Sequence, residues 1–217
     1  MSVQHLSNPA FRSGEAFAAA PRLAGAKRCL DVILVLAMLV LLTPALALIV
    51  LAITLDSRGP LLFRQHRVGL GGRTFQILKF RSMHVLEDGA AVTQAVEGDA
   101  RFTRVGRILR ILSLDELPQL FNVLAGDMSL VGPRPHATKH DGYYRSRIAD
   151  YVLRHQVKPG VTGWAQVNGL RGPTPDAALM QARIAHDIWY IRNASLWLDL
   201  KILARTPREV LRRRNAL

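Results

Sequence analysis

Residues 32–55 read VILVLAMLVLLTPALALIVLAITL, a run of 24 residues without a charged side chain between Asp31 and Asp56. About 20 consecutive apolar residues are enough to cross the hydrocarbon core of a bilayer as a helix. A cleaved signal peptide is a poor alternative, because the run is too long, begins late in the chain and has no small-residue cleavage site after it. The run therefore predicts a retained membrane segment, with the rest of the chain outside the hydrocarbon.

The middle of this run carries the dipeptide Thr43-Pro44. Proline lacks a backbone N–H and its ring clashes with the carbonyl four residues earlier, so we expect a break in the helix there. Basic residues flank both ends, which assigns both flanks to the cytoplasmic side under the positive-inside bias. The pattern favours a re-entrant helix-break-helix hairpin over a single-pass anchor, which length alone would also allow. The flanking residues are Arg22, Lys27 and Arg28 before the run and Arg58, Arg64 and Arg67 after it.

The composition limits the classes of partner. The 217-residue chain has a formal net charge of +13, which favours nucleic acid, anionic membrane lipids or phosphorylated substrates. Only 6% of its residues are aromatic, too few for the stacking that nucleic-acid binding requires, so we expect no nucleic acid. The single cysteine excludes an intramolecular disulfide and fits a catalytic part that faces the reducing cytoplasm.

The chain divides into three expected regions: a loosely ordered leader at residues 1–26, the membrane hairpin at 27–57 and a catalytic domain at 58–217. In the last region, two short apolar runs at 61–68 and 74–80 are joined by three glycines, which predicts a β-hairpin.

Two further segments, residues 102–112 and 195–214, repeat apolar residues at the helical period and place arginines on the opposite side. They predict amphipathic basic helices at the membrane interface. The first could instead face phosphate groups, and a core-facing helix with a solvated arginine face is an equal alternative for it. The predicted fold class is α+β, mostly α, with a small β-hairpin and interfacial helices around a cytoplasmic active site.

Residues 113–120, SLDELPQL, place two adjacent carboxylates in an apolar run. Ser113 followed three residues later by Glu116 matches the capping box, which would make the acids features of a helix N-terminus. Pro118 opposes this interpretation, because it would fall inside the helix. The alternative is that Asp115 and Glu116 are catalytic.

The acids suit phosphate chemistry. A carboxylate surrounded by cations is expected to keep a depressed pKa, so that Asp115 stays ionised and can attack phosphorus. Glu116 could hold a Mg²⁺ ion that neutralises phosphate charge. No zinc-type spacing of histidine and cysteine, Walker loop or Gly-x-Gly-x-x-Gly motif competes with this interpretation. The candidate phosphate-binding residues are Lys79, Arg81, Arg110, Arg134 and Arg171.

Together the motifs closely resemble the monotopic polyprenyl-phosphate phosphoglycosyl transferases, which are bacterial sugar transferases, over about residues 27–210. The resemblance rests on five segments in order: KFRSM at 79–83, SLDELPQLFNVL at 113–124, MSLVGPRPH at 128–136, VKPGVTGWAQVNGLRG at 157–172 and WLDLKIL at 197–203.

The resemblance implies transfer of a sugar 1-phosphate from a UDP-sugar to undecaprenyl phosphate, at the cytoplasmic face of the bacterial inner membrane. It implies that Asp115 carries the phosphosugar covalently, that Glu116 is its Mg²⁺-associated partner and that UMP is released. The product would initiate the synthesis of an exopolysaccharide or another surface glycan. The sequence most resembles members that use UDP-glucose, with galactose next, and it leaves a homodimer open.

Two other classes are compatible with the sequence. A noncatalytic scaffold subunit of a polysaccharide assembly complex would keep the fold without needing Asp115. A membrane-tethered polyanion-binding module would explain the charge. Release of UMP that depends on Asp115 separates the enzyme from both.

Overall fold

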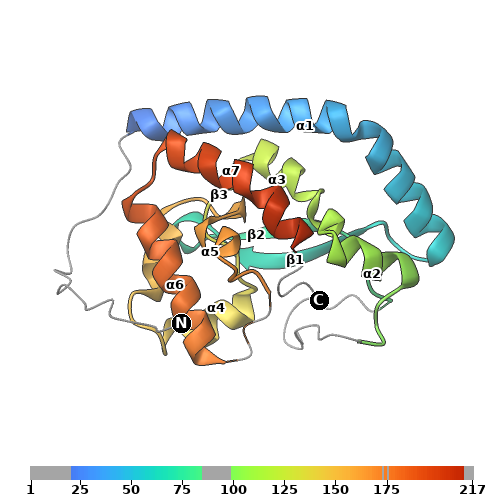
Figure 1. The fold of residues 1–217 in the computed structure, drawn as a ribbon. Coiled ribbons are helices and arrows are strands. Elements are labelled where there is room, and N and C mark those ends of the chain that lie inside the picture. The colour runs from blue at the N-terminus through green and yellow to red at the C-terminus, as the bar shows by residue number, and fades with distance from the viewer. Residues whose placement is uncertain (1–20, 85–98, 173, 175, 213–217) are drawn as a thin grey trace.

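The computed structural model describes residues 21–84, 99–172, 174 and 176–212. They form a mostly helical α+β structure with two small two-stranded sheets (Figure 1), which confirms the predicted class. The helices are α1 (Pro21–Asp56), α2 (Arg104–Ile111), α3 (Gln119–Ala125), α4 (Thr138–Arg145), α5 (Trp164–Val167), α6 (Ala177–Arg192) and α7 (Leu196–Leu211). The strands are β1 (Leu62–Val68), β2 (Thr74–Phe80), β3 (Ser129–Val131) and β4 (Gly160–Thr162), and 3-10 turns are η1 (Leu70–Gly72), η2 (Leu114–Glu116) and η3 (Tyr151–Gln156).

Helix α1 is continuous through Pro44 but bends partway along its length (Figure 1). Proline cannot donate a hydrogen bond to the carbonyl of Val40, and the neighbouring Thr43 hydroxyl instead bonds the carbonyl of Leu39 at 2.7 Å. The expected break is therefore a bend within one helix. The helix begins at Pro21, within the region expected to be a leader, and residues 1–20 lie outside the described part.

The long helix is poorly covered by protein. Its stretch from Ala24 to Asp56 has a mean hydropathy of 3.0 in its most apolar window, and 11% of that window is buried. Val40, Leu41 and Leu55 are each more than three-quarters exposed. By length and composition the helix could cross a membrane, and such exposed apolar side chains indicate association with lipid.

The first third of α1 is tied to the rest of the chain by polar contacts. Lys27 donates a hydrogen bond to Asp199 on α7, which also accepts one from the Tyr190 hydroxyl on α6. Arg28 donates to the last carbonyls of α3, and Asp31 accepts from the backbone N–H of Leu130 on β3. These contacts fix the apolar helix to the part of the structure that carries the acids.

The predicted β-hairpin is confirmed. Strands β1 and β2 pair antiparallel, with Leu62 opposite Phe80 and Val68 opposite Thr74. The side chain of Asn122 on α3 then holds β2 along its edge, because it accepts from the N–H of Leu78 and donates to the carbonyl of Gln76. The end of the hairpin is thereby placed beside α3.

The predicted amphipathic helix at 102–112 is confirmed as α2. Thr103 caps it by accepting from the N–H of Gly106, and Leu109 is buried against the C-terminal part of α1. Ile108, which the periodicity placed on the apolar side, is instead 58% exposed. The helix has only eight residues, and its buried side is narrower than the predicted stripe.

Helix α2 approaches the end of the hairpin so closely that only glycine fits at the contact. A Cβ atom on Gly106 would lie 2.1 Å from the carbonyl oxygen of Ser82, whereas one on Gly142 in α4 would meet nothing within 4 Å.

We predict that Gly106→Ala destabilises the fold by about 1–3 kcal/mol or more through overpacking. The matched Gly142→Ala should be neutral or stabilise by about 0.5–1 kcal/mol, because glycine is a poor helix former. Thermal unfolding of both variants in detergent micelles tests this, and equal melting temperatures would contradict the close approach.

Candidate active site

The two adjacent acids lie in a tight turn between α2 and α3. Ser113 lies between the C-cap of α2 and η2 in the left-handed conformation, with φ 55°, which is uncommon for a residue other than glycine. The chain then makes the single turn η2, and α3 begins after Pro118. The Ser113 side chain makes no capping hydrogen bond, so the capping-box interpretation is wrong. The strained turn instead directs a buried Asp115 toward the hairpin.

Glu116 joins three segments that are distant in sequence. Its Oε1 lies 2.7 Å from Lys79 Nζ, at the end of β2. Arg134, in the loop after β3, donates from Nη2 to Oε1 at 2.6 Å and from Nη1 to Oε2 at 3.1 Å. Lys79 Nζ also lies 4.0 Å from Asp115 Oδ2. The fold therefore brings both predicted acids together with two of the predicted cations.

Arg110 and Arg171 lie at the margin of this cluster. The Arg110 guanidinium lies 4.9 Å from the centre of the Phe102 ring, and its charge lowers the pKa of Asp115. Arg171 is electrostatically coupled to both acids, and burial lowers its pKa. Its Nη1 is buried and has no hydrogen-bond partner among the described residues. Both residues supply positive charge to the cluster.

Arg81 lies elsewhere, although it is two residues after Lys79. It is 2% exposed, and its terminal nitrogens donate to the carbonyls of Pro60 and Ser57 just after α1. The predicted role of Arg81 in phosphate binding is therefore not supported by its position. Its contacts instead fasten the C-terminal end of α1 to the end of the hairpin.

The two carboxyl groups have opposite pKa shifts. Burial raises the pKa of Asp115, and the charge of Lys79 offsets only part of this effect, while the neighbouring charge of Glu116 adds to it. Burial alone would also raise the pKa of Glu116, but the charges and hydrogen bonds of Arg134 and Lys79 hold it well below its usual range. The expectation of a depressed pKa is therefore wrong for Asp115, because burial raises its pKa and Glu116 takes the close contacts with the cations.

The carboxylates also suit a divalent cation of the oxygen-binding kind. In the described part of the chain, no group of three or more acidic, histidine or cysteine side chains gathers as a complete metal cage. Asp115 and Glu116 form a pair, and a carboxylate has about four lone-pair positions, so Glu116 keeps acceptor capacity beside its two cations. One or two carboxylates, completed by phosphate oxygens and water, match the coordination that Mg²⁺ prefers.

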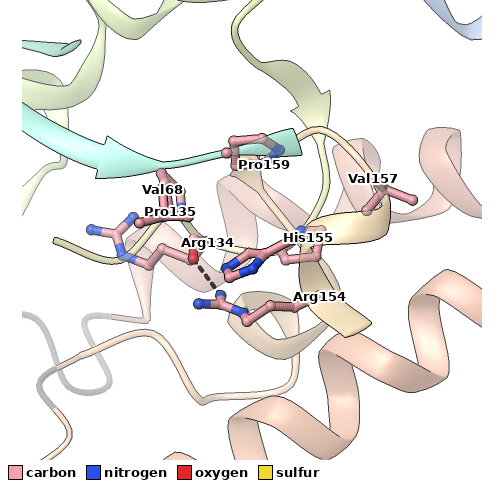
Figure 2. A pocket seen from close by; sticks show the side chains of 9 residues that line it. Val68, Arg134, Pro135, Arg154, His155, Val157 and Pro159 are labelled. Carbon is pink, nitrogen blue, oxygen red and sulfur yellow. Dashed lines mark hydrogen bonds between the residues drawn. The ribbon is translucent and has the colours of Figure 1, made fainter. Parts of the chain in front are cut away.

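A second buried group lies beneath the arginine loop and was not predicted from the sequence. Arg154, His136 and Asp187 are each less than 9% exposed and come from η3, the loop after β3 and α6. Figure 2 shows Arg154 donating to the backbone carbonyl of Arg134 at the floor of a small pocket, whereas the Arg134 guanidinium points away from it. No local pattern marks this group, because its members are far apart in sequence.

The chain is similar to known proteins over most of its length. A family model described as bacterial sugar transferase matches residues 22–213. A Caulobacter vibrioides protein named UDP-glucose:undecaprenyl-phosphate glucose-1-phosphate transferase is 60% identical over 88% of this chain and 71% of its own length.

Two other relatives are longer than this chain. An Escherichia coli protein with the same name as the Caulobacter protein is 52% identical over 82% of this chain and 38% of its own length. An Aeromonas hydrophila UDP-N-acetylgalactosamine-undecaprenyl-phosphate N-acetylgalactosaminephosphotransferase is 44% identical over 85% of this chain and 43% of its own length. The chain thus spans less than half of each of these two proteins.

The opposite pKa shifts predict opposite effects of two neutral substitutions on stability at pH 7. Above its raised folded-state pKa, ionised Asp115 destabilises the fold, so Asp115→Asn should raise the melting temperature. Glu116 stabilises the fold above its unfolded-state pKa, so Glu116→Gln should cost about 1.5–3 kcal/mol by weakening charge-assisted hydrogen bonds to two partly buried cations.

Thermal melts between pH 4 and pH 8 measure both effects. The gain from Asp115→Asn should shrink as the pH falls through the folded-state pKa of Asp115. A lower melting temperature for Asp115→Asn at pH 7 would contradict the raised pKa.

Proposed function

This chain belongs to the bacterial sugar transferase family, and on that premise we propose that it transfers glucose 1-phosphate from UDP-glucose to undecaprenyl phosphate and releases UMP. The names of the Caulobacter and Escherichia coli relatives support this reaction. The Aeromonas relative is named for a different sugar, so the choice of glucose rests on the two more similar proteins. The observation that carries the proposal is the adjacent pair of buried Asp115 and partly buried Glu116 among cations from separate segments.

In the first step, an Asp115 carboxylate oxygen attacks the phosphorus that bears the sugar. A new bond forms between Asp115 and phosphorus, and the bond to the bridging oxygen of UMP breaks, so that UMP leaves with the electron pair. Asp115 suits this role because Lys79 Nζ lies 4.0 Å from its Oδ2. The lone pairs of the Asp115 carboxylate are therefore less engaged than those of Glu116.

The cations would stabilise the charge that develops during this step. Lys79 and Arg134 are held by Glu116 beside Asp115, so they are positioned before substrate binds. Arg171 has a buried Nη1 without a partner among the described residues, and the charge of Arg110 already acts on Asp115. We propose all four as phosphate-binding residues and assign no such role to Arg81.

In the second step, a phosphate oxygen of undecaprenyl phosphate attacks the same phosphorus. The bond to Asp115 breaks, the carboxylate is regenerated, and the sugar leaves as an undecaprenyl diphosphate derivative that can initiate an exopolysaccharide or another surface glycan. Because UMP leaves before the lipid reacts, the kinetics should be ping-pong.

We also propose Mg²⁺ as the cofactor, with Glu116 as the protein residue that holds it. When bound, the ion would offset negative charge on the diphosphate. Glu116 itself keeps Lys79 and Arg134 in place and has remaining lone pairs on its carboxylate.

We further propose that α1 is a re-entrant hairpin whose two ends face the cytoplasm at the bacterial inner membrane. The bend of α1, its uncovered apolar side chains and the basic flanks support this topology. Helices α2 and α7 would lie at the membrane interface. In α7 this is supported by Trp197 and Leu211, which are about three-quarters exposed while Leu198 is buried. Residues 58–217 would then form the catalytic domain.

The two-step reaction predicts a covalent intermediate. Protein incubated with Mg²⁺ and UDP-glucose labelled in the β-phosphate, without lipid, should retain label and release UMP in equal amounts. Asp115→Asn should retain none, while Arg81→Ala, which keeps the acids and their cations, should still be labelled. Transfer that requires both substrates together, without labelled enzyme, would contradict the mechanism. A parallel panel of UDP-sugars tests the choice of glucose.

The re-entrant topology predicts that both ends of α1 face the cytoplasm. In a Cys29→Ala background, Ala24→Cys and Pro60→Cys place thiols at exposed positions on either side of the apolar run. An impermeant thiol reagent should label neither in intact cells and both after permeabilisation. Labelling of one of them from outside would mean that α1 crosses the membrane.

A further inference from the structure

Arg154 lies in η3 and is 4% exposed, yet it makes polar contacts to two other segments, the loop after β3 and α6. Its Nη2 donates to the backbone carbonyl of Arg134 and lies 3.0 Å from Asp187 Oδ2 on α6. Its Nη1 lies 2.6 Å from His136 Nδ1. A buried arginine with a carboxylate partner can hold a rigid geometry, because its planar guanidinium donates in fixed directions.

These contacts hold one side of the loop that carries Arg134. The guanidinium of arginine only donates, so Nδ1 of His136 accepts and the imidazole is neutral. Burial and the charge of Arg154 hold the pKa of His136 well below its usual range, in agreement with this assignment. The loop is therefore fixed at the carbonyl of Arg134 and at the ring two residues later.

The other side of the same loop is held by backbone hydrogen bonds. The N–H of Gly132 donates to the carbonyl of Thr162, and the N–H of Gly160 donates to the carbonyl of Pro133, each at 2.9 Å. Pro133 and Pro135 restrict the backbone between these points. The loop is also held from β1, where the N–H of Val68 donates to the carbonyl of His136 and Arg67 donates to the carbonyl of Pro135. Arg154 is the buried side chain that contacts the carbonyl of Arg134 between these points.

The supported segment ends in the site. The Arg134 guanidinium makes two parallel hydrogen bonds to Glu116, so a displacement of its backbone would misalign both. We propose that Arg154, oriented by Asp187, is a positioning residue of the transferase reaction that acts through Arg134. This inference rests on the proposed function and assigns Arg154 no contact with substrate.

A buried arginine could also serve only the stability of the fold, and Arg81 offers a matched comparison. It is similarly buried and also donates to backbone carbonyls, but those carbonyls belong to Ser57 and Pro60. The same change, arginine to lysine, can be made at both positions. Only the change at Arg154 should depend on the presence of the Arg134 side chain.

The test is a double-mutant cycle on the turnover number. Arg154→Lys should lower turnover about tenfold, since small misplacements of a catalytic group are costly. In an Arg134→Ala background, Arg154→Lys should lower turnover by an additional factor of less than about two, because the Arg134 guanidinium that Arg154 positions is absent. Arg81→Lys should lower turnover by the same factor in both backgrounds.

A second measurement does not depend on activity. Backbone hydrogen exchange of residues 130–137, followed by mass spectrometry, should accelerate in Arg154→Lys and not in Arg81→Lys. Where Arg154→Lys fails to fold, Asp187→Asn replaces it, because it loosens Arg154 without removing it.

The outcomes separate this inference from the proposed reaction. Equal losses from Arg154→Lys with and without Arg134, or unchanged exchange of residues 130–137, would overturn the positioning role while the wild-type transferase stays active. A wild-type protein that releases no UMP would overturn the proposed reaction, and the exchange experiment would still decide whether Arg154 positions the loop.

Discussion

The double ion pair of Glu116 is the interaction on which the site depends. One carboxylate accepts from Lys79 at the end of a hairpin and from Arg134 in a loop after another sheet, so it fixes three chain segments at one point. Buried charges are costly unless their geometry and hydrogen bonds are nearly complete, and the two-point contact with Arg134 meets that condition. Asp115 receives only the looser contact with Lys79, and burial therefore raises its pKa. The same arrangement stabilises the carboxylate of Glu116 and leaves the burial of the Asp115 carboxylate poorly compensated by positive charge. A carboxylate in that position suits the role of a nucleophile.

A second constraint comes from the long apolar helix. Only 11% of its apolar window is buried by protein, yet Lys27, Arg28 and Asp31 fasten one end of the helix to α7, α3 and β3, and Arg81 fastens the other end. These contacts are polar and directional, so they set the position of the helix relative to the acids rather than merely attaching it. A rigid link of this kind suits an enzyme whose acceptor substrate is a lipid phosphate, because the height of the site above the hydrocarbon is then determined by the fold.

Behind the cations lies a further polar group in which Arg154 and Asp187 support the Arg134 loop. Hydrogen bonds between buried polar groups strengthen one another and favour one geometry. The site thus has the charged side chains of Lys79 and Arg134 beside Asp115, and the buried side chains of Arg154 and Asp187 behind the loop that carries Arg134. This division explains how a site assembled from short strands and loops can present two arginine nitrogens to one carboxylate.

The sequence by itself determined the elements whose signal is local. The apolar run predicted the lipid-associated helix, the strand-length runs around three glycines predicted the hairpin, and the helical period predicted α2, because each depends on residues adjacent in the chain. Only the tertiary structure decided which charges meet. Lys79 and Arg81 are both basic residues near the end of the same predicted strand. Lys79 contacts Glu116, whereas Arg81 contacts the carbonyl of Ser57 just after α1, because β2 ends at Phe80 between them. The pKa of Asp115 could not be predicted by counting nearby cations, because it depends on burial and on which acid the cations contact. The role of Arg154 was equally hidden, since its partners are brought together only by folding.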